Sequence, residues 1–446
     1  MPKNKKKNKP LSSRGNQSGD DSSEFNADEN ASTISNASTN MSYQDVDMDE
    51  TGKKITDDFI EKIDNIDSEL NICLDGLLEK GFKEREDSLK LLKKLFSHKY
   101  LIDNILNKRF TLSESLIKCL KKGKTNEQVL SANVLMLTLI QLGSSPTETN
   151  AILTDCKQTL TELIDDEKVE PEVRAECVKA LALAVFITNE NSTDLVAILE
   201  KFEGIFSKSF AKGDNTLRVF PPRVYELHAA ALSSWCLLLC TMPLHFVNKL
   251  SIKYVKNFKD FLRSQDTDLR ICAGETISFL YELAQCDSHS DVSVFEDDNL
   301  LELLRNLASE SSKFRSKKEK KAQRSSFRDI LKTMEEGEFD VQTVKFGTES
   351  LILDNWVKRK EYETFRDVLG TGINSHLAEN EYLRDLFDLG PPVQGNEQAR
   401  KAALSLMSSK QKALMNKEQF KSRTKSLLKK RETKDYAQGQ EMDDED

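Results

Sequence analysis

The stretch REDSLKLL, residues 85 to 92, decides the fold because its pattern recurs along the chain. A polar or aromatic residue begins the pattern, small or apolar residues follow three and four positions later, and an aliphatic residue follows seven positions later. Residues at these offsets share one face of an α-helix. Further copies begin at Gln128, Arg174, Tyr225 and Arg270, at spacings of 43, 46, 51 and 45 residues, and the copy at Tyr225 is the weakest.

This period is typical of armadillo/HEAT-like repeats, which are built from about 40 to 47 residues. Small side chains allow neighbouring helices to approach closely, while the aliphatic residue fills their shared core. Pro146, Pro171 and Pro243 fall between the expected helices, where proline can begin a helix without loss of an interior hydrogen bond. With only 9 Pro and 17 Gly in 446 residues, the chain is predicted to be an all-α helical-repeat solenoid. The alternative is an irregular helical bundle.

Composition divides the chain into five segments. The first is rich in Ser, Asn and Asp and has too few apolar residues to offset the entropy lost on ordering. A Gly-Pro-Pro sequence at 390 to 392 is expected to end the helices that precede the last basic segment. The predicted segments are a disordered tail with a basic start at 1–54, armadillo/HEAT-like repeats at 55–312, a separate and mostly helical C-terminal module at 313–393, a basic helix at 394–431, and an acidic disordered tail at 432–446.

Residues 341 to 356, within the C-terminal module, alternate polar and apolar side chains around Gly347. This alternation predicts a small hairpin, the one place in the chain where strands are expected. The eight cysteines are scattered through apolar helical segments, where we expect packed thiols and no disulfide bonds.

The net charge of -9 is an average over segments of opposite sign. Residues 1–14 carry +6, residues 313–328 carry +7 and residues 400–431 carry +10, so the rest of the chain sums to -32. Separated blocks of opposite charge usually mark distinct interaction surfaces or tails.

The last basic block is the sharpest candidate for a binding site. A helix over about 397–431 would have only a narrow apolar stripe, with positive residues all round its axis. Such a helix suits enclosure by RNA phosphates, whereas a membrane-surface helix would show a broad apolar face. A solvated tail and a calmodulin-like groove ligand are the alternatives. The candidate RNA-binding residues are Lys410, Lys412, Lys417, Lys421, Arg423, Lys425, Lys429, Lys430 and Arg431, and the secondary basic patch is Lys317, Lys318, Lys320, Lys321 and Arg324.

Catalytic and metal-binding motifs are missing from the sequence. It contains no G-x-x-x-x-G-K-[ST], G-x-S-x-G, H-E-x-x-H or C-x-x-C. Cys236 and Cys240 share a helical face, but a structural metal would need two more ligands. We therefore expect a protein that is not an enzyme and that takes no cofactor, metal or small-molecule substrate.

The most apolar stretch, AAALSSWCLLLCTM at 229–242, is shorter than the roughly 20 residues that span a bilayer. It is predicted to be a buried helix, and no membrane partner is expected. Because no apolar segment follows the basic start, no secretory signal is predicted and an intracellular protein is expected.

Several motifs, in order along the chain, resemble the interferon-related developmental regulator family. They are MPKNKKKNK at the start, KCLKKGKTNEQ (118–128), RICAGETISFLYELA (270–284), QRSSFRDIL (323–331), VKFG (344–347), Trp356, FRDVLG (365–370), NEYLRDLFDLGPPV (380–393) and FKSRTK (420–425). The resemblance implies an armadillo-like repeat region followed by a family-specific C-terminal domain.

The resemblance also implies two roles, neither of which needs catalysis. One is translational repression on idle ribosomes, with the basic C-terminal helix in the mRNA channel and ribosomal RNA as its partner. The other is nuclear co-regulation of transcription, with the concave face of the solenoid as a scaffold for histone-deacetylase co-repressors during differentiation. Cytoplasmic and nuclear locations are both expected.

Overall fold

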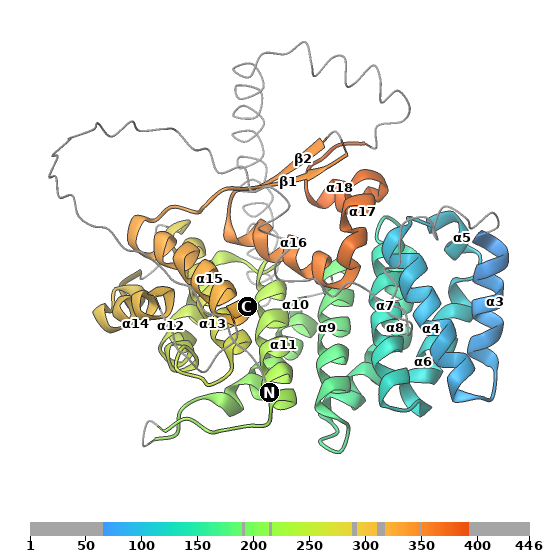
Figure 1. Cartoon of the computed structure of the whole chain (residues 1–446), viewed down its shortest axis with the longest axis horizontal. Coiled ribbons are helices and arrows are strands. Elements are labelled where there is room, and N and C mark those ends of the chain that lie inside the picture. The colour runs from blue at the N-terminus through green and yellow to red at the C-terminus, as the bar shows by residue number, and fades with distance from the viewer. Residues whose placement is uncertain are drawn as a thin grey trace, which may run out of the picture.

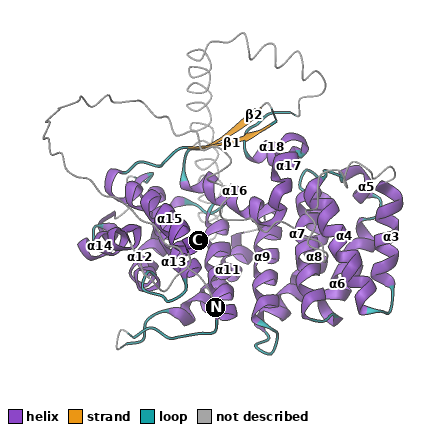
Figure 2. Cartoon of the chain, viewed as in Figure 1, coloured by secondary structure: helices purple, strands orange, loops and turns teal. Residues whose placement is uncertain are grey.

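The computed structural model shows an all-α solenoid with one small hairpin (Figures 1 and 2). The predicted tails at 1–54 and 432–446 and the basic helix at 394–431 lie outside the residues that the structure describes. The described residues are 66–189, 192–213, 216–287, 292–309, 317–347 and 349–391.

Helices pack in antiparallel pairs, and the pairs stack side by side (Figure 1). The first helices of the pairs form an outer row and the second helices form an inner row. The outer row is α3 (Ile66–Leu78), α6 (Arg109–Lys122), α8 (Pro146–Asp165), α10 (Ser192–Phe206), α12 (Leu244–Phe261) and α14 (Asp298–Ser309). The inner row is α4 (Phe82–His98), α7 (Thr125–Gln141), α9 (Pro171–Thr188), α11 (Pro222–Leu239), α13 (Thr267–Gln285) and α15 (Lys317–Glu336). Short helices α5 (Ile102–Leu106), η1 (Ser207–Ser209) and η2 (Val292–Phe295) connect them.

All five sequence copies fall on inner-row helices, which confirms the repeat prediction. Their aliphatic residues at the seventh offset are fully buried, as Leu92 in α4 and Ile277 in α13 illustrate. A sixth copy, which the sequence analysis missed, begins at Gln323 in α15 and places Phe327 and Ile330 in the core. The large Phe327 fits because Gly274 lies opposite: a Cβ atom there would lie 2.9 Å from Phe327 Cε1.

The residue that begins each copy, apart from Tyr225, has a structural role of its own. Its side chain donates a hydrogen bond to a backbone carbonyl group at the C-terminal end of the preceding outer helix, or in the turn after it. These carbonyl groups have no partner within their helix. The bonds are Arg85 Nη1 to Glu79 O and Lys80 O (2.9 Å each), Gln128 Nε2 to Leu120 O (2.8 Å), Arg174 Nε to Ile164 O (2.9 Å), Arg270 Nη1 to Ser264 O (2.6 Å) and Gln323 Nε2 to Leu307 O (3.3 Å).

The last helix pair, α14 and α15, spans the boundary between residues 312 and 313 that composition predicted for the end of the repeats. Helix α15 packs against α14 and α13 as the other inner helices pack against their neighbours. Repeat packing therefore continues to Glu336, and residues 317–336 belong with the repeats by their contacts.

The remaining C-terminal module begins with the predicted hairpin. Strands β1 (Gln342–Phe346) and β2 (Glu349–Leu353) are antiparallel, and the turn contains Gly347 at φ 51°. Helices α16 (Trp356–Leu369), η3 (Gly370–Gly372), α17 (Ile373–Glu379) and α18 (Glu381–Leu386) follow. Helix α16 crosses the inner row and contacts α13, α11, α7 and α4 (Figure 1). The module therefore covers the repeats instead of standing apart from them.

Gly372 marks the closest approach of the module to the repeats, because a Cβ atom there would lie 1.6 Å from the carbonyl oxygen of Ser97. We expect Gly372→Ala to lower the free energy of unfolding by about 1–3 kcal/mol, since the backbones must separate. Urea unfolding measures the change. Gly204→Ala is the control, because nothing lies within 4 Å of that site in α10, and a gain of about 0.5–1 kcal/mol is expected there. Equal effects of the two substitutions would contradict the prediction.

Candidate functional site

Helix α16 occupies the inner-row face of the solenoid. Lys360 Nζ donates to Ser233 Oγ in α11 at 2.5 Å, and the backbone N–H of Trp356 donates to Glu282 in α13 at 2.8 Å. At the other end of the module, His376 Nε2 donates to the carbonyl oxygen of Phe96 at 3.0 Å. Helix α16 therefore covers part of the inner-row face, on which the co-repressor hypothesis places its partner.

A buried charge cluster holds α16 against α13 and α15. Arg359 contacts Asp329 and Glu363 at 3.0 Å each and Glu275 at 3.7 Å. Burial raises the pKa of Glu275 to about 8, and the neighbouring charge of Glu363 adds to this effect. Burial also disfavours the charged form of Glu363, but Arg359 and Arg366 outweigh it and lower the pKa of Glu363. Burial also raises the pKa of Asp329, against the lowering effect of Arg359. Of the three carboxyl groups, Glu275 is the most distant from Arg359, and Glu363 is the one whose pKa the arginines lower.

Arg384 fixes the end of the described chain. Its side chain is 1% exposed and pairs with Glu349 at 2.9 Å, while Nη1 donates to the carbonyl oxygen of Leu377 at 2.8 Å. Nε donates to Gly390 O at 2.8 Å, and Nη2 donates to Leu389 O and Pro391 O at 3.1 and 3.2 Å. The Gly-Pro-Pro stop was predicted from sequence, but this anchor was missed because its acceptors are mostly backbone carbonyl groups.

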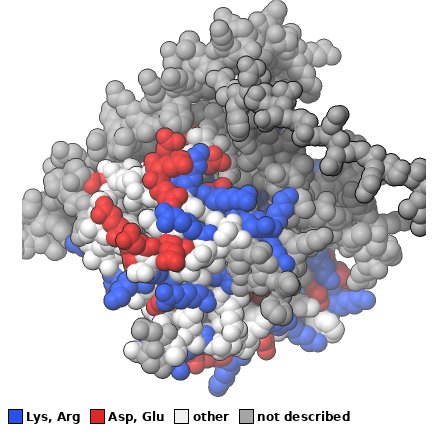
Figure 3. All heavy atoms as spheres, turned by 60° about the vertical axis from the view of Figure 1, so that its left-hand side comes forward, with Lys and Arg blue, Asp and Glu red and all other residues white. Residues whose placement is uncertain are grey.

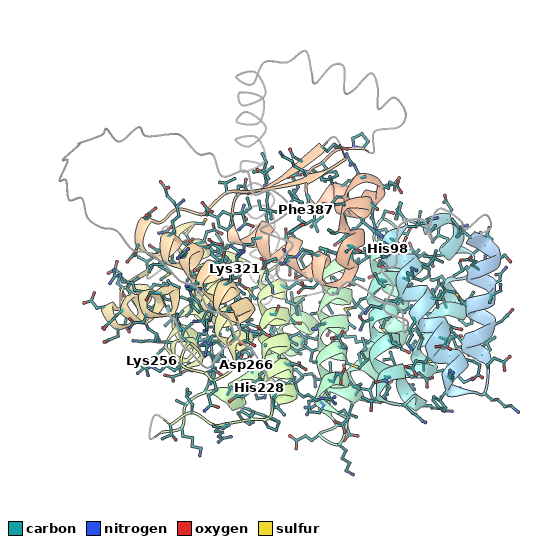
Figure 4. All side chains as sticks on the ribbon, viewed as in Figure 1. His98, His228, Lys256, Asp266, Lys321 and Phe387 are labelled. Atoms are coloured by element: carbon teal, nitrogen blue, oxygen red, sulfur yellow. The ribbon has the colours of Figure 1, made fainter. Side chains whose placement is uncertain are left out.

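The secondary basic patch lies partly on α15. Lys321 is exposed and Lys320 and Arg324 are half-buried, while Phe327 and Ile330 are buried beneath them. Figure 3 shows basic side chains gathered at this end of the solenoid, and Figure 4 labels Lys321. Arg328 is exposed and extends the patch by one helical turn. The sequence could have predicted this residue, because it follows Arg324 by four positions and therefore shares its face of the helix. Lys317 and Lys318 begin α15, but their side chains lie outside the described residues, as do all the candidates from Lys410 to Arg431.

Most of the cysteine side chains are buried or half-buried, as expected for packed thiols, whereas Cys286 is exposed. His228 and His376 are buried, and burial lowers the pKa of each to about 4. All eight cysteines, including Cys236 and Cys240, are free thiols. The described part of the chain contains no group of three or more His, Cys, Asp or Glu side chains that could hold a metal ion. Nor does any helix among these residues have the length and apolar character to cross a membrane.

Two family models match the chain. Residues 30–335 match the interferon-related developmental regulator model, and residues 380–435 match the interferon-related protein conserved region. Interferon-related developmental regulator 1 of Mus musculus is 37% identical over 369 residues, which cover 83% of this chain and 81% of that protein. The chain belongs to the interferon-related developmental regulator family. The Homo sapiens protein of the same name is 36% identical over 369 residues, with the same coverage of both chains.

Interferon-related developmental regulator 2 of Mus musculus is also 36% identical, over 370 residues and 83% of each chain. Two engineered proteins of known structure align with 59% and 62% of this chain, at TM-scores of 0.37 and 0.39. The solenoid assignment therefore rests on the helix packing described above.

The family matches follow the structure of this interferon-related developmental regulator. The first match ends at 335, within one residue of the end of α15. The second begins at Asn380, whose side chain accepts hydrogen bonds from the N–H groups that start α18, and it includes Arg384. The Arg384 anchor and the basic residues from Lys410 to Arg431 therefore lie within one conserved region.

Glu275→Gln tests the charge cluster. Because the pKa of Glu275 is about 8 in the folded protein, against 4.5 for an ordinary glutamate, the folded state holds an extra proton between these values. The free energy of unfolding therefore decreases as pH rises through this window. We expect Glu275→Gln to be more stable than the wild type at pH 8, on the order of 1 kcal/mol, with a smaller difference at pH 5. Denaturant midpoints at both pH values measure this.

The control is Glu302→Gln, which changes an exposed glutamate on α14. It should follow the wild type at both pH values. If Glu275→Gln also follows the wild type, Glu275 does not hold its proton in the folded state.

Proposed function

We propose that this protein is a non-enzymatic regulator of gene expression that binds ribosomes and represses translation. Its basic C-terminal segment would lie in the mRNA channel and neutralise phosphates of ribosomal RNA. The observation that carries the proposal is the family match at 380–435, because the densest basic block of the chain falls within it. Lysine and arginine contacts to phosphates give affinity that depends little on sequence and strongly on salt.

The Arg384 anchor supports this proposal. It binds the carbonyl groups of Leu389, Gly390 and Pro391, so the position of the chain directly before the basic segment is fixed. The exposed basic face of α15 offers a second contact for ribosomal RNA at one end of the solenoid. No membrane or small-molecule substrate enters the proposal.

The alternative role is a nuclear scaffold for histone-deacetylase co-repressors. It has less support, because α16 covers part of the inner-row face on which such a partner was expected. A scaffold would have to use the rest of that face, the outer row or the ends of the solenoid. Cytoplasmic and nuclear locations both fit the proposed function, since the basic segments can serve import as well as RNA contact.

Ribosome cosedimentation tests the proposed function. We expect the full chain to sediment with purified ribosomes, and the triple variant Lys421→Gln, Arg423→Gln, Lys425→Gln to bind about tenfold more weakly at roughly 150 mM salt. Each lost phosphate contact should also reduce the slope of log affinity against log salt by about 0.7–0.9. A protein without residues 397–446 should lose most of its binding.

The matched control is Lys168→Gln with Lys212→Gln, two exposed lysines outside both basic surfaces. These substitutions should leave sedimentation unchanged. Equal binding by the full chain and the truncated chain across the salt series would refute the role of the basic segment. Co-purification with a deacetylase from nuclei, without ribosomal proteins, would favour the scaffold.

A further inference from the structure

Helix α12 in the outer row carries a stripe of positive side chains. Spacings of four, three and three residues place the four lysines on one side of the helix, and the arginine lies two residues beyond the end of the helix. At a rise of 1.5 Å per residue, the lysines span about 15 Å. Its members, here called the α12 stripe, are Lys249, Lys253, Lys256, Lys259 and Arg263.

Part of this charge has no acidic partner. Among the described residues, no carboxylate lies within 4 Å of Lys249 or Lys256, and both lysines are exposed. The other three contact acids: Lys253 pairs with Glu203 at 3.2 Å, Arg263 with Asp260 at 3.7 Å, and Lys259 with Asp297. The stripe therefore keeps an excess of about two positive charges.

Two other outer-row helices, α8 and α14, expose mainly acidic side chains, whereas α6 exposes Lys118, Lys121 and Lys122 with Glu114 as its one acidic residue. Helix α8 exposes Asp155, Glu162 and Asp165, and α14 exposes Asp298 and Glu302. Helix α12 has Asp260 as its one acidic residue. The stripe is thus a local positive surface on an acidic solenoid, and such a surface attracts a polyanion.

A hollow of about 330 Å³ adjoins the C-terminal end of the stripe. Arg263 belongs to both, and polar Gln265 and Asn306 line the hollow beside it. Lys256 and Asp266 mark this region in Figure 4. The volume is at the lower limit for a small-ligand pocket, so it could receive a single phosphate group or nucleotide.

Arg270, which also lines the hollow, is a buried cation with no carboxylate partner among the described residues. It is 2% exposed, and its hydrogen bonds go to neutral groups: Ser264 O at 2.6 Å, Thr267 Oγ1 at 3.1 Å and Gln323 Oε1 at 2.6 Å. Its Nε atom has no hydrogen-bond partner in the part of the chain that the structure describes. Since an uncompensated buried charge is costly, an anion bound in the hollow would be stabilised by Arg270 through the local field.

Acidic residues near the hollow do not cancel this field fully. Asp266 accepts a hydrogen bond from the N–H of Leu269 at 2.8 Å as the N-cap of α13, and Asp268 lies on the first turn. Neither lines the hollow, while Arg263 and Arg270 do.

We propose that the α12 stripe and its adjoining hollow bind a single RNA strand, with phosphates along the lysines and one phosphate or nucleotide in the hollow. A partner helix fits less well, because Ile252 is the one large apolar side chain exposed on α12, and helix docking needs several apolar anchors. Four of the five side chains are lysines, which bind phosphates as point charges. This inference rests on the proposed function, to which it adds a third RNA contact that is independent of residues 392–446.

The test uses the full chain and an oligouridylate of about 20 nucleotides, with affinity measured by fluorescence anisotropy over a salt series. We expect Lys249→Gln with Lys256→Gln to weaken binding about tenfold at low salt and to reduce the salt slope by about 1.4, since two phosphate contacts are lost. Arg263→Gln should weaken binding further when added to this pair. Lys168→Gln with Lys212→Gln removes the same charge elsewhere and should leave both quantities unchanged.

Three outcomes would overturn the inference: a slope equal to that of the wild type, an equal loss in the control pair, or a loss of polyglutamate binding without a loss of RNA binding. The last would assign the surface to an acidic polypeptide. The triple variant at 421, 423 and 425 separates this inference from the proposed function. If only the triple variant loses RNA affinity, the proposed function stands and the stripe is not a contact. If only the stripe variant loses RNA affinity, the stripe is a contact and the role of the basic C-terminal segment fails.

Discussion

Each inner helix, apart from α11, carries in its first two turns a side chain that donates to a carbonyl group at the end of the preceding outer helix or in the turn after it. This hydrogen bond joins the two helices of a pair at the residue from which the positions four and seven places later enter the core. In the copy that starts at Tyr225, the hydroxyl group donates instead to Arg218 O in a long connection, at 3.2 Å, which agrees with the weakness of its pattern. Arg270 also donates to Gln323, so one guanidinium group joins two successive repeats.

The module that covers the inner row is held by apolar as well as polar contacts, since its buried side chains join the core of the repeats and Phe365 of α16 packs against Phe186 of α9. A buried ion cluster such as that of Arg359 adds little net stability compared with an apolar core, but it strongly disfavours any displaced arrangement in which one charge is left alone. The cluster thus sets the position of α16 more than it sets the stability of the fold. A solenoid whose own helix covers part of its inner face has the rest of that face, the outer row and the two ends left for partners.

Local patterns predicted the repeats and the hairpin, since their signals are contained in a single helix or turn. The sixth copy was missed because Phe327 stands at the fourth position after its start, where the other copies have a smaller side chain. Phenylalanine fits there because Gly274, 53 residues earlier, has no side chain. The location of α16 could not be predicted, because its contacts join residues far apart in the sequence. Lys360 in α16 contacts Ser233, 127 residues earlier, and His376 in α17 contacts Phe96, 280 residues earlier. The α12 stripe escaped a search for contiguous basic blocks, since helical geometry, not sequence proximity, brings its lysines together.

Positive charge is distributed over three parts of the chain: the α12 stripe, the basic face of α15 and the segment from Lys410 to Arg431. The α12 stripe and the basic face of α15 lie on a rigid solenoid, and Arg384 fixes the position of residue 391. Contacts joined in this way act as linked sites, so the second and third bind at a high effective concentration once the first has bound. The binding free energies of the linked contacts add. The slopes of log affinity against log salt also add, so the combined affinity depends steeply on ionic strength. If the proposed contacts form, a large RNA assembly that reaches several of these surfaces is therefore expected to bind more tightly than a short strand that reaches one of them.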